Sequence, residues 1–285
     1  MKKIFYKAFF LGLLATTAIS CSSDDSKDDT DPDNPNTGVK YVHKVLIEDA
    51  TGTWCQYCPR VAYGIQQAKA NSTLGDKVVA VAIHSGVNGY PDPMQISKGL
   101  TITNLFSSDY GLTGFPFGLI NRTSEWEYPE PNNLAQVFNS INREEGSPVG
   151  IKISSELTNT GGTVSASFKF SKGYENLKYS IYIIENEVVT PESPQSNSTG
   201  YFNGQGKDFV HNDVLRAVSG TATGNTIGNV TADQEVTKSG ESVEFTLFNN
   251  DLSKVEVVVF VTDNSGKVLN VQSTHANVSI DYAKM

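Results

Sequence analysis

A pair of cysteines, Cys55 and Cys58, constrains the fold of this chain more than any other feature. A short loop separates the pair from residues 41–48, whose apolar and β-branched side chains predict a strand. Pro59 is tolerated in the first turn of a helix, and apolar residues then recur at helical spacing to about residue 70. The cysteines are therefore expected at a strand-to-helix junction, with Cys55 at the helix N-terminus.

Segments typical of strands and helices alternate between residues 40 and 147. The continuous apolar run 78–83 is typical of a buried parallel strand, and the stretch 113–121 predicts a turn followed by a strand. Residues 93–107 are weakly helical, and 130–141 have the pattern of an amphipathic helix. The order β-α-β-α-β-α predicts an α/β layer for this first domain.

From residue 148 to residue 285 the pattern changes to short strands separated by polar turns. The strand candidates are 151–154, 164–170, 179–185, 243–248, 255–262 and 268–272. The last two are joined by a strong hairpin signal. This pattern predicts an all-β second domain, an immunoglobulin-like antiparallel sandwich. The usual disulfide of such a sandwich is absent because no cysteine lies in this part of the chain.

One short stretch of the second domain concentrates polar side chains. It contains His211, Asn212, Asp213 and Arg216. The preferred interpretation is a strand or turn whose side chains satisfy backbone groups. The alternative is a binding site, or an interface with the first domain.

Residues 1–20 have the character of a secretory signal peptide. The apolar stretch after the positively charged start is too short to span a membrane, which takes roughly 20 apolar residues. The four residues that end at Cys21 resemble a bacterial lipobox, although Ala18 stands where leucine is common. Cys21 is therefore expected to carry a lipid anchor. An ordinarily secreted protein and an uncleaved anchor are the alternatives.

Residues 21–39 are rich in aspartate and nearly free of apolar side chains. Such a segment cannot offset its ordering entropy by burial, so a disordered tether is expected. The simplest interpretation is a solvated spacer. The alternative is an address, because acidic residues after a lipidated cysteine resemble the surface-export signal of Bacteroidetes lipoproteins.

The charge balance limits the possible partners. The chain carries a net charge of −9, and removal of the lysine-bearing leader makes the mature protein more acidic still. Without a basic stripe or interleaved basic and aromatic residues, binding to nucleic acid is not expected. Neither a metal nor another cofactor is expected, because no second cysteine pair or Cys–His cluster completes a zinc site.

A strand that ends in an acid, followed by Trp54 and a Cys-x-x-Cys pair that opens a helix, resembles the thioredoxin superfamily. A helix N-terminus stabilises a thiolate, so Cys55, the more exposed cysteine, is assigned as nucleophile and Cys58 as resolving thiol. The resemblance implies a cis-proline opposite the disulfide, and Phe115–Pro116 stands in the matching place. Pro116 would then shape a groove for a peptide substrate. A vestigial or structural disulfide is the alternative.

Further assignments depend on the same resemblance. The family has a buried acid behind its disulfide. Glu48 is preferred for this position because it closes the predicted strand, and Asp49 is the alternative. A third interpretation is that both are solvated loop acids. Gln56 and Tyr57 replace the Gly-Pro of reducing thioredoxins, and a tyrosine before the second cysteine resembles periplasmic disulfide isomerases. Trp54 is expected to pack beside the site, or to be an ordinary core aromatic. The candidate substrate-binding residues around the pair are Trp54, Gln56, Tyr57 and Phe115.

The chain as a whole resembles the twenty-eight-kilodalton outer-membrane protein family of Bacteroidetes. The resemblance spans about residues 40–275 and is carried by the stretch 48–52, by Cys55, Cys58 and Pro59, and by the stretch 211–216. It implies an outer-membrane location, on the periplasmic face or the cell surface, and a thioredoxin-like fold. Adhesin or receptor roles are implied, without an established substrate or partner.

Two functions remain open at this point. One is thiol–disulfide exchange outside the cytoplasm, by an oxidoreductase or isomerase. The other is a surface-binding lipoprotein whose disulfide only closes a loop. The sequence identifies neither the protein partner nor the disulfide substrate.

Overall fold

The computed structural model of this protein describes residues 38–202 and 206–285. The predicted signal peptide 1–20, the lipid-bearing Cys21 and nearly all of the tether 21–39 lie outside these ranges. The described chain is mostly β, with a mixed sheet and few helices. Among the described residues, no helix is both long enough and apolar enough to cross a membrane.

The first part of the chain forms alternating strands and helices. Its elements are β1 (Val45–Thr51), α1 (Pro59–Lys69), β2 (Val78–His84), α2 (Ser97–Asp109), β3 (Phe117–Ile120), β4 (Ser124–Glu125) and α3 (Leu134–Asn139). Two short 3-10 turns, Gly75–Lys77 and Glu130–Asn132, precede β2 and α3. The predicted order β-α-β-α-β-α is confirmed, with the short strand β4 added before the last helix.

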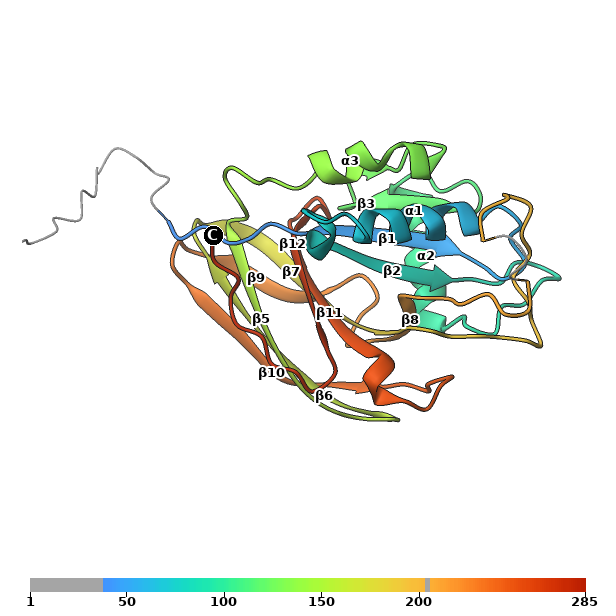
Figure 1. Cartoon of the computed structure of the whole chain (residues 1–285). Coiled ribbons are helices and arrows are strands. Elements are labelled where there is room, and N and C mark those ends of the chain that lie inside the picture. Colours follow the sequence, from blue (N-terminus) through green and yellow to red (C-terminus); the bar gives the residue numbers. More distant parts are fainter. Residues whose placement is uncertain (1–37, 203–205) are drawn as a thin grey trace, which may run out of the picture. The chain divides into compact units, whose positions relative to one another are not determined.

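β1 lies inside this layer, parallel to β2 and antiparallel to β3. Val45 and Ile47 share a core with apolar residues of α1 and α3, which lie on the same side of the strands (Figure 1). Leu46 and Ala50 share a different core with apolar residues of α2. Neighbouring residues of a strand point to opposite faces, so each residue of β1 belongs to one of these two environments.

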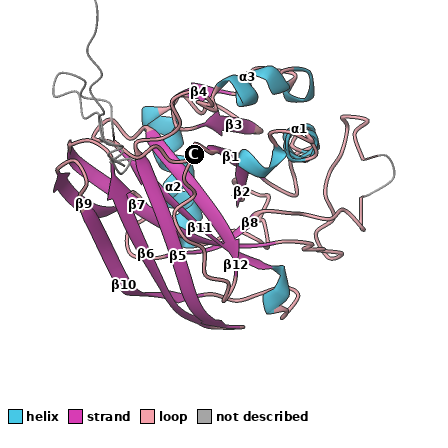
Figure 2. Cartoon of the chain, turned by 60° about the vertical axis from the view of Figure 1, so that its left-hand side comes forward, coloured by secondary structure: helices cyan, strands magenta, loops and turns pink. Residues whose placement is uncertain are grey.

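The second part of the chain forms a two-sheet sandwich. Its strands are β5 (Val149–Thr158), β6 (Gly161–Phe170), β7 (Tyr174–Glu185), β8 (Val214–Val218), β9 (Asn225–Val230), β10 (Glu235–Glu244), β11 (Val255–Thr262) and β12 (Val268–His275); the 3-10 turn Leu252–Lys254 precedes β11. β10, β6 and β5 form an antiparallel sheet, and Figure 2 shows these long strands away from α1 and α3. Phe168 and Phe170 of this sheet share a core with Ile181 and Val257 of the larger sheet. The immunoglobulin-like arrangement stays a prediction.

One sheet runs through both parts of the chain, in the order β12-β11-β7-β8-β2-β1-β3-β4, with β9 paired to β7. The junction is between β2 and β8, which are parallel, and Ala82 N donates to Asp213 O at 2.7 Å. The core beneath α2 contains Ile102 of the first part and Tyr182 and Phe260 of the second. Residues 38–285 cluster as one compact unit. The division into a thioredoxin-like domain 40–147 and a sandwich domain 148–285 stays a prediction.

Candidate functional site

The two cysteines lie where the chain passes from β1 to α1, and a disulfide joins them. Cys58 is the N-cap of α1, and Pro59 occupies the first turn. Cys55 lies in the preceding turn, where its backbone N donates to Gly52 O at 3.0 Å. The predicted strand-to-helix junction is therefore where the disulfide is found.

Both cysteines are shielded from solvent. Cys55 is 4% exposed and Cys58 is 1% exposed. Cys55 is the more exposed of the two, as predicted, but only slightly.

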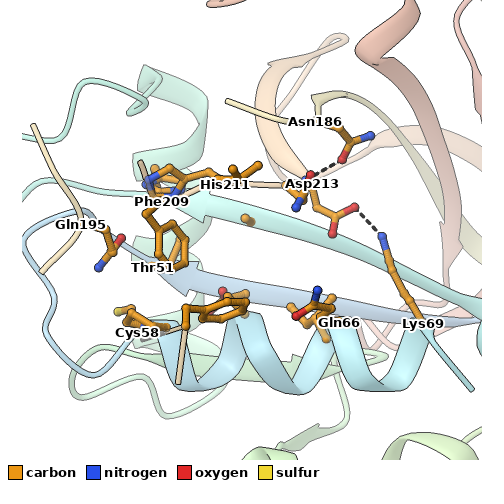
Figure 3. A pocket seen from close by; sticks show the side chains of 18 residues that line it. Thr51, Cys58, Gln66, Lys69, Asn186, Gln195, Phe209, His211 and Asp213 are labelled. Carbon is orange, nitrogen blue, oxygen red and sulfur yellow. Dashed lines mark hydrogen bonds and ion pairs between the residues drawn. The ribbon is translucent and has the colours of Figure 1, made fainter. Parts of the chain in front are cut away.

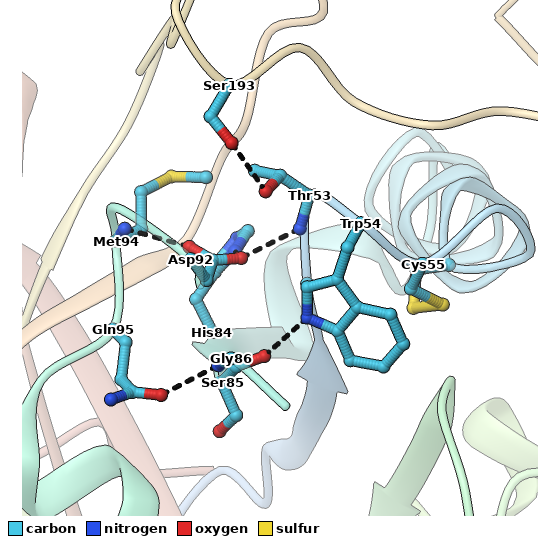
Figure 4. A network of polar contacts seen from close by, with 12 residues as sticks. Thr53, Trp54, Cys55, His84, Ser85, Gly86, Asp92, Met94, Gln95 and Ser193 are labelled. Atoms are coloured by element: carbon cyan, nitrogen blue, oxygen red, sulfur yellow. Dashed lines mark hydrogen bonds and ion pairs between the residues drawn. A yellow bond between two sulfur atoms is a disulfide. The ribbon is translucent and has the colours of Figure 1, made fainter. Parts of the chain in front are cut away.

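Trp54 packs beside the disulfide loop. Its Nε1 donates to Ser85 O at 2.8 Å (Figure 4). Its ring meets Phe115 edge-on with centroids 5.4 Å apart, and Tyr90 lies at 6.5 Å. Phe115 precedes Pro116 through a cis peptide bond. Trp54, which precedes Cys55, and Phe115, which precedes Pro116, thus form one aromatic wall.

Two buried acids follow each other in β1, and they face opposite sides of the sheet. Asp49 lines a cavity together with Cys58. Glu48 faces the α2 side and accepts two hydrogen bonds from Arg122, each of 2.7 Å. β1 continues to Thr51, so Glu48 does not close the strand. The preference for Glu48 as the acid behind the disulfide is therefore corrected: the structure places Asp49 there.

Asp49 is a buried acid whose hydrogen bonding is incomplete. It is 2% exposed, and its Oδ1 has no hydrogen-bond partner among residues 38–202 and 206–285. Burial, followed by the negative charges of Glu130 and Asp213, raises the pKa of Asp49 well above its usual value, against the opposing effect of Arg60. Burial disfavours the charged form of a carboxyl group, so Asp49 holds its proton at a pH where an exposed aspartate has lost it.

A cavity of about 510 Å³ runs along α1 beside the disulfide (Figure 3). One wall is a stripe of the helix that includes Cys58, Ile65 and Lys69. The facing wall contains residues 209–213 from the second part of the chain. At the end away from Cys58, Lys69 Nζ donates to Asp213 Oδ1 at 2.5 Å. The cavity therefore connects the disulfide with a charged pair.

Two histidines meet in the same cavity, because the rings of His84 and His211 lie edge-on with centroids 5.1 Å apart. His84 Nδ1 lies 2.9 Å from Asp92 Oδ2, and Asp92 accepts hydrogen bonds from the backbone of Thr53 and Met94 (Figure 4). Burial alone would raise the pKa of Asp92, but these hydrogen bonds, led by that of His84, lower it. Burial, followed by repulsion from His84, lowers the pKa of His211 to about 3. His211 is therefore uncharged at neutral pH.

The structure divides the predicted polar stretch 211–216. His211 and Asn212 line the cavity with Cys58. Arg216 is not part of its wall: its guanidinium donates twice to Thr246 O, at 3.0 and 2.8 Å, and stacks over Phe248. The stretch therefore brings two of its three proposed binding residues to the cavity that Cys58 also lines, and the third side chain supports a neighbouring loop.

A segment that the sequence analysis did not single out, residues 193–198, lies along the disulfide loop; we call it the strap. Ser196 N donates to Thr53 O at 2.7 Å, and Ser198 N donates to Gln56 O at 2.8 Å. Ser198 Oγ also donates to Gln56 Oε1. The predicted binding residue Gln56 is thus held by the strap, whereas Tyr57 is 49% exposed.

Gln195 is the buried centre of the strap. Its Nε2 donates to Cys55 O at 2.9 Å and lies 3.3 Å from Gly52 O. These contacts join residues 140 or more positions apart in the chain. Polar loop residues carry no periodic pattern, so no signal in the sequence identified the strap.

Residues 103–279 match the family described as Outer membrane protein Omp28. The chain belongs to this family. The matched segment begins within α2, so the disulfide lies outside it and family membership says nothing about its chemistry. The family recognised in the sequence is thereby confirmed. Within the described parts of the chain, no group of three or more His, Cys, Asp or Glu could hold a metal ion.

Two solved structures share the fold of this Omp28-family chain. HBP35 of Porphyromonas gingivalis is 19% identical with a TM-score of 0.65, covering 84% of this chain and 76% of that one. A protein of Agrobacterium tumefaciens is 13% identical with a TM-score of 0.50, and the match covers 83% of this chain and 96% of that one. No curated protein matches the sequence. At these identities the likeness extends to the fold alone.

Proposed function

We propose that this protein is an outer-membrane lipoprotein that carries out thiol–disulfide exchange outside the cytoplasm. The Omp28 family supports the location, and the disulfide at the start of α1 supports the chemistry. The observation that carries the proposal is the environment of Asp49, a buried acid with a raised pKa that shares a cavity with Cys58. Such perturbed acids are characteristic of sites where a proton must move.

In the reduced protein, the Cys55 thiolate attacks one sulfur of a partner disulfide and forms a mixed disulfide, releasing the other partner sulfur as a thiolate. Asp49, in its ionised form, takes the proton of Cys58. The Cys58 thiolate then attacks the sulfur of Cys55, which restores the intramolecular disulfide and releases the second partner thiolate. Two electrons pass from the protein to the partner, and the reverse sequence oxidises a partner.

The surroundings of the disulfide support contact with a partner. Tyr57 is exposed beside the pair, and the aromatic wall of Trp54 and Phe115 leads toward Pro116. We assign these side chains to partner binding. In this proposal His211 and Asn212 belong to the inner cavity rather than to the outer contact, and Arg216 to neither.

The first test is the reduction potential of the Cys55–Cys58 pair, measured by glutathione-buffer titration and alkylation of free thiols. A value between about −270 and −120 mV indicates an exchangeable disulfide, and a value below about −300 mV a structural one. Cys55→Ser should abolish turnover of a disulfide substrate, and Cys58→Ala should accumulate the mixed disulfide. Turnover that survives in Cys55→Ser would refute the assigned role.

The lipid anchor at Cys21 and the acidic tether 21–39 belong to the same proposal, and two measurements test them. Cys21→Ser should abolish incorporation of labelled palmitate and release the protein from the membrane fraction. Proteinase K added to intact cells should digest the protein if the tether directs it to the cell surface. Full protection would place the protein on the periplasmic face.

A second candidate is a non-catalytic binding lipoprotein, with the sandwich, proposed to be immunoglobulin-like, as its recognition part. The burial of Cys55 and Cys58 favours it, because a catalytic thiol must be reached by its partner. In that case the double variant Cys55→Ser/Cys58→Ser should keep binding to a surface or matrix partner. Loss of binding in the double variant, at unchanged folding, would contradict a purely structural disulfide.

A further inference from the structure

The strap, residues 193–198, occupies backbone acceptors of the disulfide loop. Ser196 N donates to Thr53 O at 2.7 Å, and Ser198 N donates to Gln56 O at 2.8 Å. N–H groups two positions apart share one edge of an extended chain. The strap is therefore bound in the way an extended polypeptide partner would be bound, through main-chain hydrogen bonds.

Gln195 adds a buried side-chain contact to the same loop. Its Nε2 donates to Cys55 O at 2.9 Å and lies 3.3 Å from Gly52 O. Gln195 is buried, whereas Ser196 beside it is exposed. Cys55 is the proposed nucleophile, so the strap is fastened at the reacting end of the loop.

The strap is held mainly by these hydrogen bonds. Its other residues are serines, an asparagine and the exposed Pro194, so it buries little apolar surface. A hydrogen bond within a protein adds little net stability, because water offers an equivalent partner when the bond opens. Segments with few buried apolar contacts open at a low cost in free energy. The strap is therefore a segment that a partner can displace.

The segments on either side of the strap are fixed independently of it. Val188 and His211 form a β-bridge in which each backbone N donates to the other's O, at 2.9 and 2.8 Å. After the strap, the ring of Tyr201 stacks on Tyr63 of α1 with centroids 4.7 Å apart. The strap can therefore leave the disulfide loop while the sheet that carries the site stays intact.

We propose that the strap occupies the site of an extended polypeptide partner and must leave before that partner reaches Cys55. The inference rests on the proposed thiol–disulfide exchange and names the class of partner and its competitor. The partner is an extended, uncharged polar segment, because the strap that it replaces carries no charge. A carboxamide side chain near its cystine would take the place of the Gln195 amide. Strap and partner exclude each other, so the fraction of molecules with an open strap sets the apparent affinity.

The strap moves during the exchange but takes no part in the chemistry. In the reduced protein the Cys55 thiolate attacks one sulfur of the partner disulfide and releases the other as a thiolate. Cys58 then displaces the partner from Cys55. The cysteine pair is oxidised to a disulfide, and the partner disulfide is reduced to two thiols. The backbone of the partner uses the carbonyls of Thr53 and Gln56 that the strap has left.

The first experiment compares a polypeptide disulfide with a small one. The probes are the disulfide-linked dimer of the peptide Gly-Ser-Gln-Ser-Cys-Ser-Gly and 2-hydroxyethyl disulfide. Each is mixed with reduced wild type or Gln195→Met, and oxidation of the cysteine pair is followed in a single turnover. Methionine has nearly the size of glutamine but no donor. Both reactions gain from easier access, but only the peptide gains from the freed carbonyls. The ratio of the peptide rate to the small-disulfide rate should rise about tenfold, the factor that one buried hydrogen bond is worth.

Gln136→Met is the matched control for this comparison. The Nε2 of Gln136 also donates to a backbone carbonyl, that of Glu125 at 2.8 Å, but in a different part of the fold. The control should keep the wild-type ratio. If Gln195→Met keeps that ratio too, the strap does not compete with the partner. A lower ratio would make the strap part of the binding surface. Either result would overturn the proposal.

The second experiment leaves the strap sequence intact. The Cys58→Ala variant is joined through Cys55 either to the same peptide or to 2-mercaptoethanol, and hydrogen exchange is measured by NMR. The amides of Ser196 and Ser198 should lose their protection in the peptide adduct and keep it in the other. The amide of Ser219, which donates to a strand carbonyl, is the reference and should stay protected in both. A strap that is equally protected in both adducts would overturn displacement.

The two experiments separate this inference from the proposed function. Exchange with both disulfides at an unchanged ratio, with the strap protected in both adducts, would leave the proposed function in place and refute the role of the strap. A reduced protein that reacts with neither disulfide would refute the proposed function, and this inference with it.

Discussion

The two faces of β1 bury neighbouring acids in opposite ways. On the α2 face, Glu48 receives two hydrogen bonds from Arg122, which also donates to Tyr182 Oη at 3.1 Å. Burial alone would lower the pKa of Arg122, but Glu48 raises it. On the α1 face, the Oδ1 of Asp49 has no partner among the described residues, and the pKa of Asp49 is raised.

The two acids of this strand therefore differ in what they contribute. The ion pair of Glu48 and Arg122 holds the sheet together, because removing either partner leaves the other charge buried and unpaired in a medium of low polarity. A buried acid without a counter-ion adds nothing of that kind, but it can take up and release a proton near the cysteines. On the same side of the strand, burial also favours the neutral form of His211, whose pKa is lowered to about 3.

Breaking the pair on the α2 face should have the largest effect on stability. Arg122→Met leaves Glu48 buried and unpaired, so we expect the free energy of unfolding to fall by about 3–5 kcal/mol. Urea unfolding of the soluble chain at pH 7 measures it, with Lys152→Met as the exposed control. If Arg122→Met costs as little as the control, the contrast between the two faces is wrong.

His211 should make the cavity side sensitive to acid. Its folded pKa of about 3 lies below the usual 6.5, so the unfolded protein binds more protons between these values and stability falls as the pH falls from 6.5 to 3. Between pH 7 and pH 5 this group should cost about 2 kcal/mol. Urea unfolding of wild type and His211→Gln at both pH values tests this. The same pH dependence in both proteins would assign the loss to other groups.

Removing the strap's central amide should have a smaller effect on stability. Gln195→Ala leaves backbone carbonyls of Cys55 and Gly52 without this donor, at a cost of about 1 kcal/mol. Alkylation of Cys55 in the reduced variant should be faster, because the strap is no longer fastened there. Ser198→Ala, which removes only an exposed side-chain contact to Gln56, is the control. Alkylation no faster than in the control would show that the strap does not limit access.

Asp49→Asn should have the smallest effect on stability, under about 1 kcal/mol at pH 5. The raised folded pKa means that the folded protein binds more protons than the unfolded protein above about pH 4, so wild-type stability falls as the pH rises through that pKa. The variant should lack this fall in unfolding measured from pH 5 to pH 9. Its thiol–disulfide exchange should slow by about a hundredfold, the lower range of general acid–base catalysis. An unchanged exchange rate would remove Asp49 from the mechanism.

Local patterns in the sequence were sufficient for the secondary structure around the disulfide. The apolar run before the loop, Pro59 after Cys58, and the helical spacing that follows all act over a few residues. These features depend on neighbours in the chain, so they can be predicted without the fold. Phe115–Pro116 was assigned through the resemblance to a known family, not through its neighbours.

The choice between Glu48 and Asp49 could not be made in this way. All seven residues of β1 are buried, so no alternation of apolar and polar residues marks its two faces. The answer depends on which face α1 covers and which face Arg122 reaches, 74 positions along the chain. A preference based on where the strand ends was wrong because the strand continues to Thr51.

Short-range chemistry therefore determined the cysteine junction and the elements around it. The tertiary structure alone decided that Asp49 is the acid beside Cys58, that the strap lies along the disulfide loop, and that β8 extends the first sheet to bring His211 and Asp213 to α1. These outcomes depend on contacts between distant segments, many of them polar loops. Such contacts are selected by the packing of the whole sheet, and a loop carries no periodic signal of the partner it will meet.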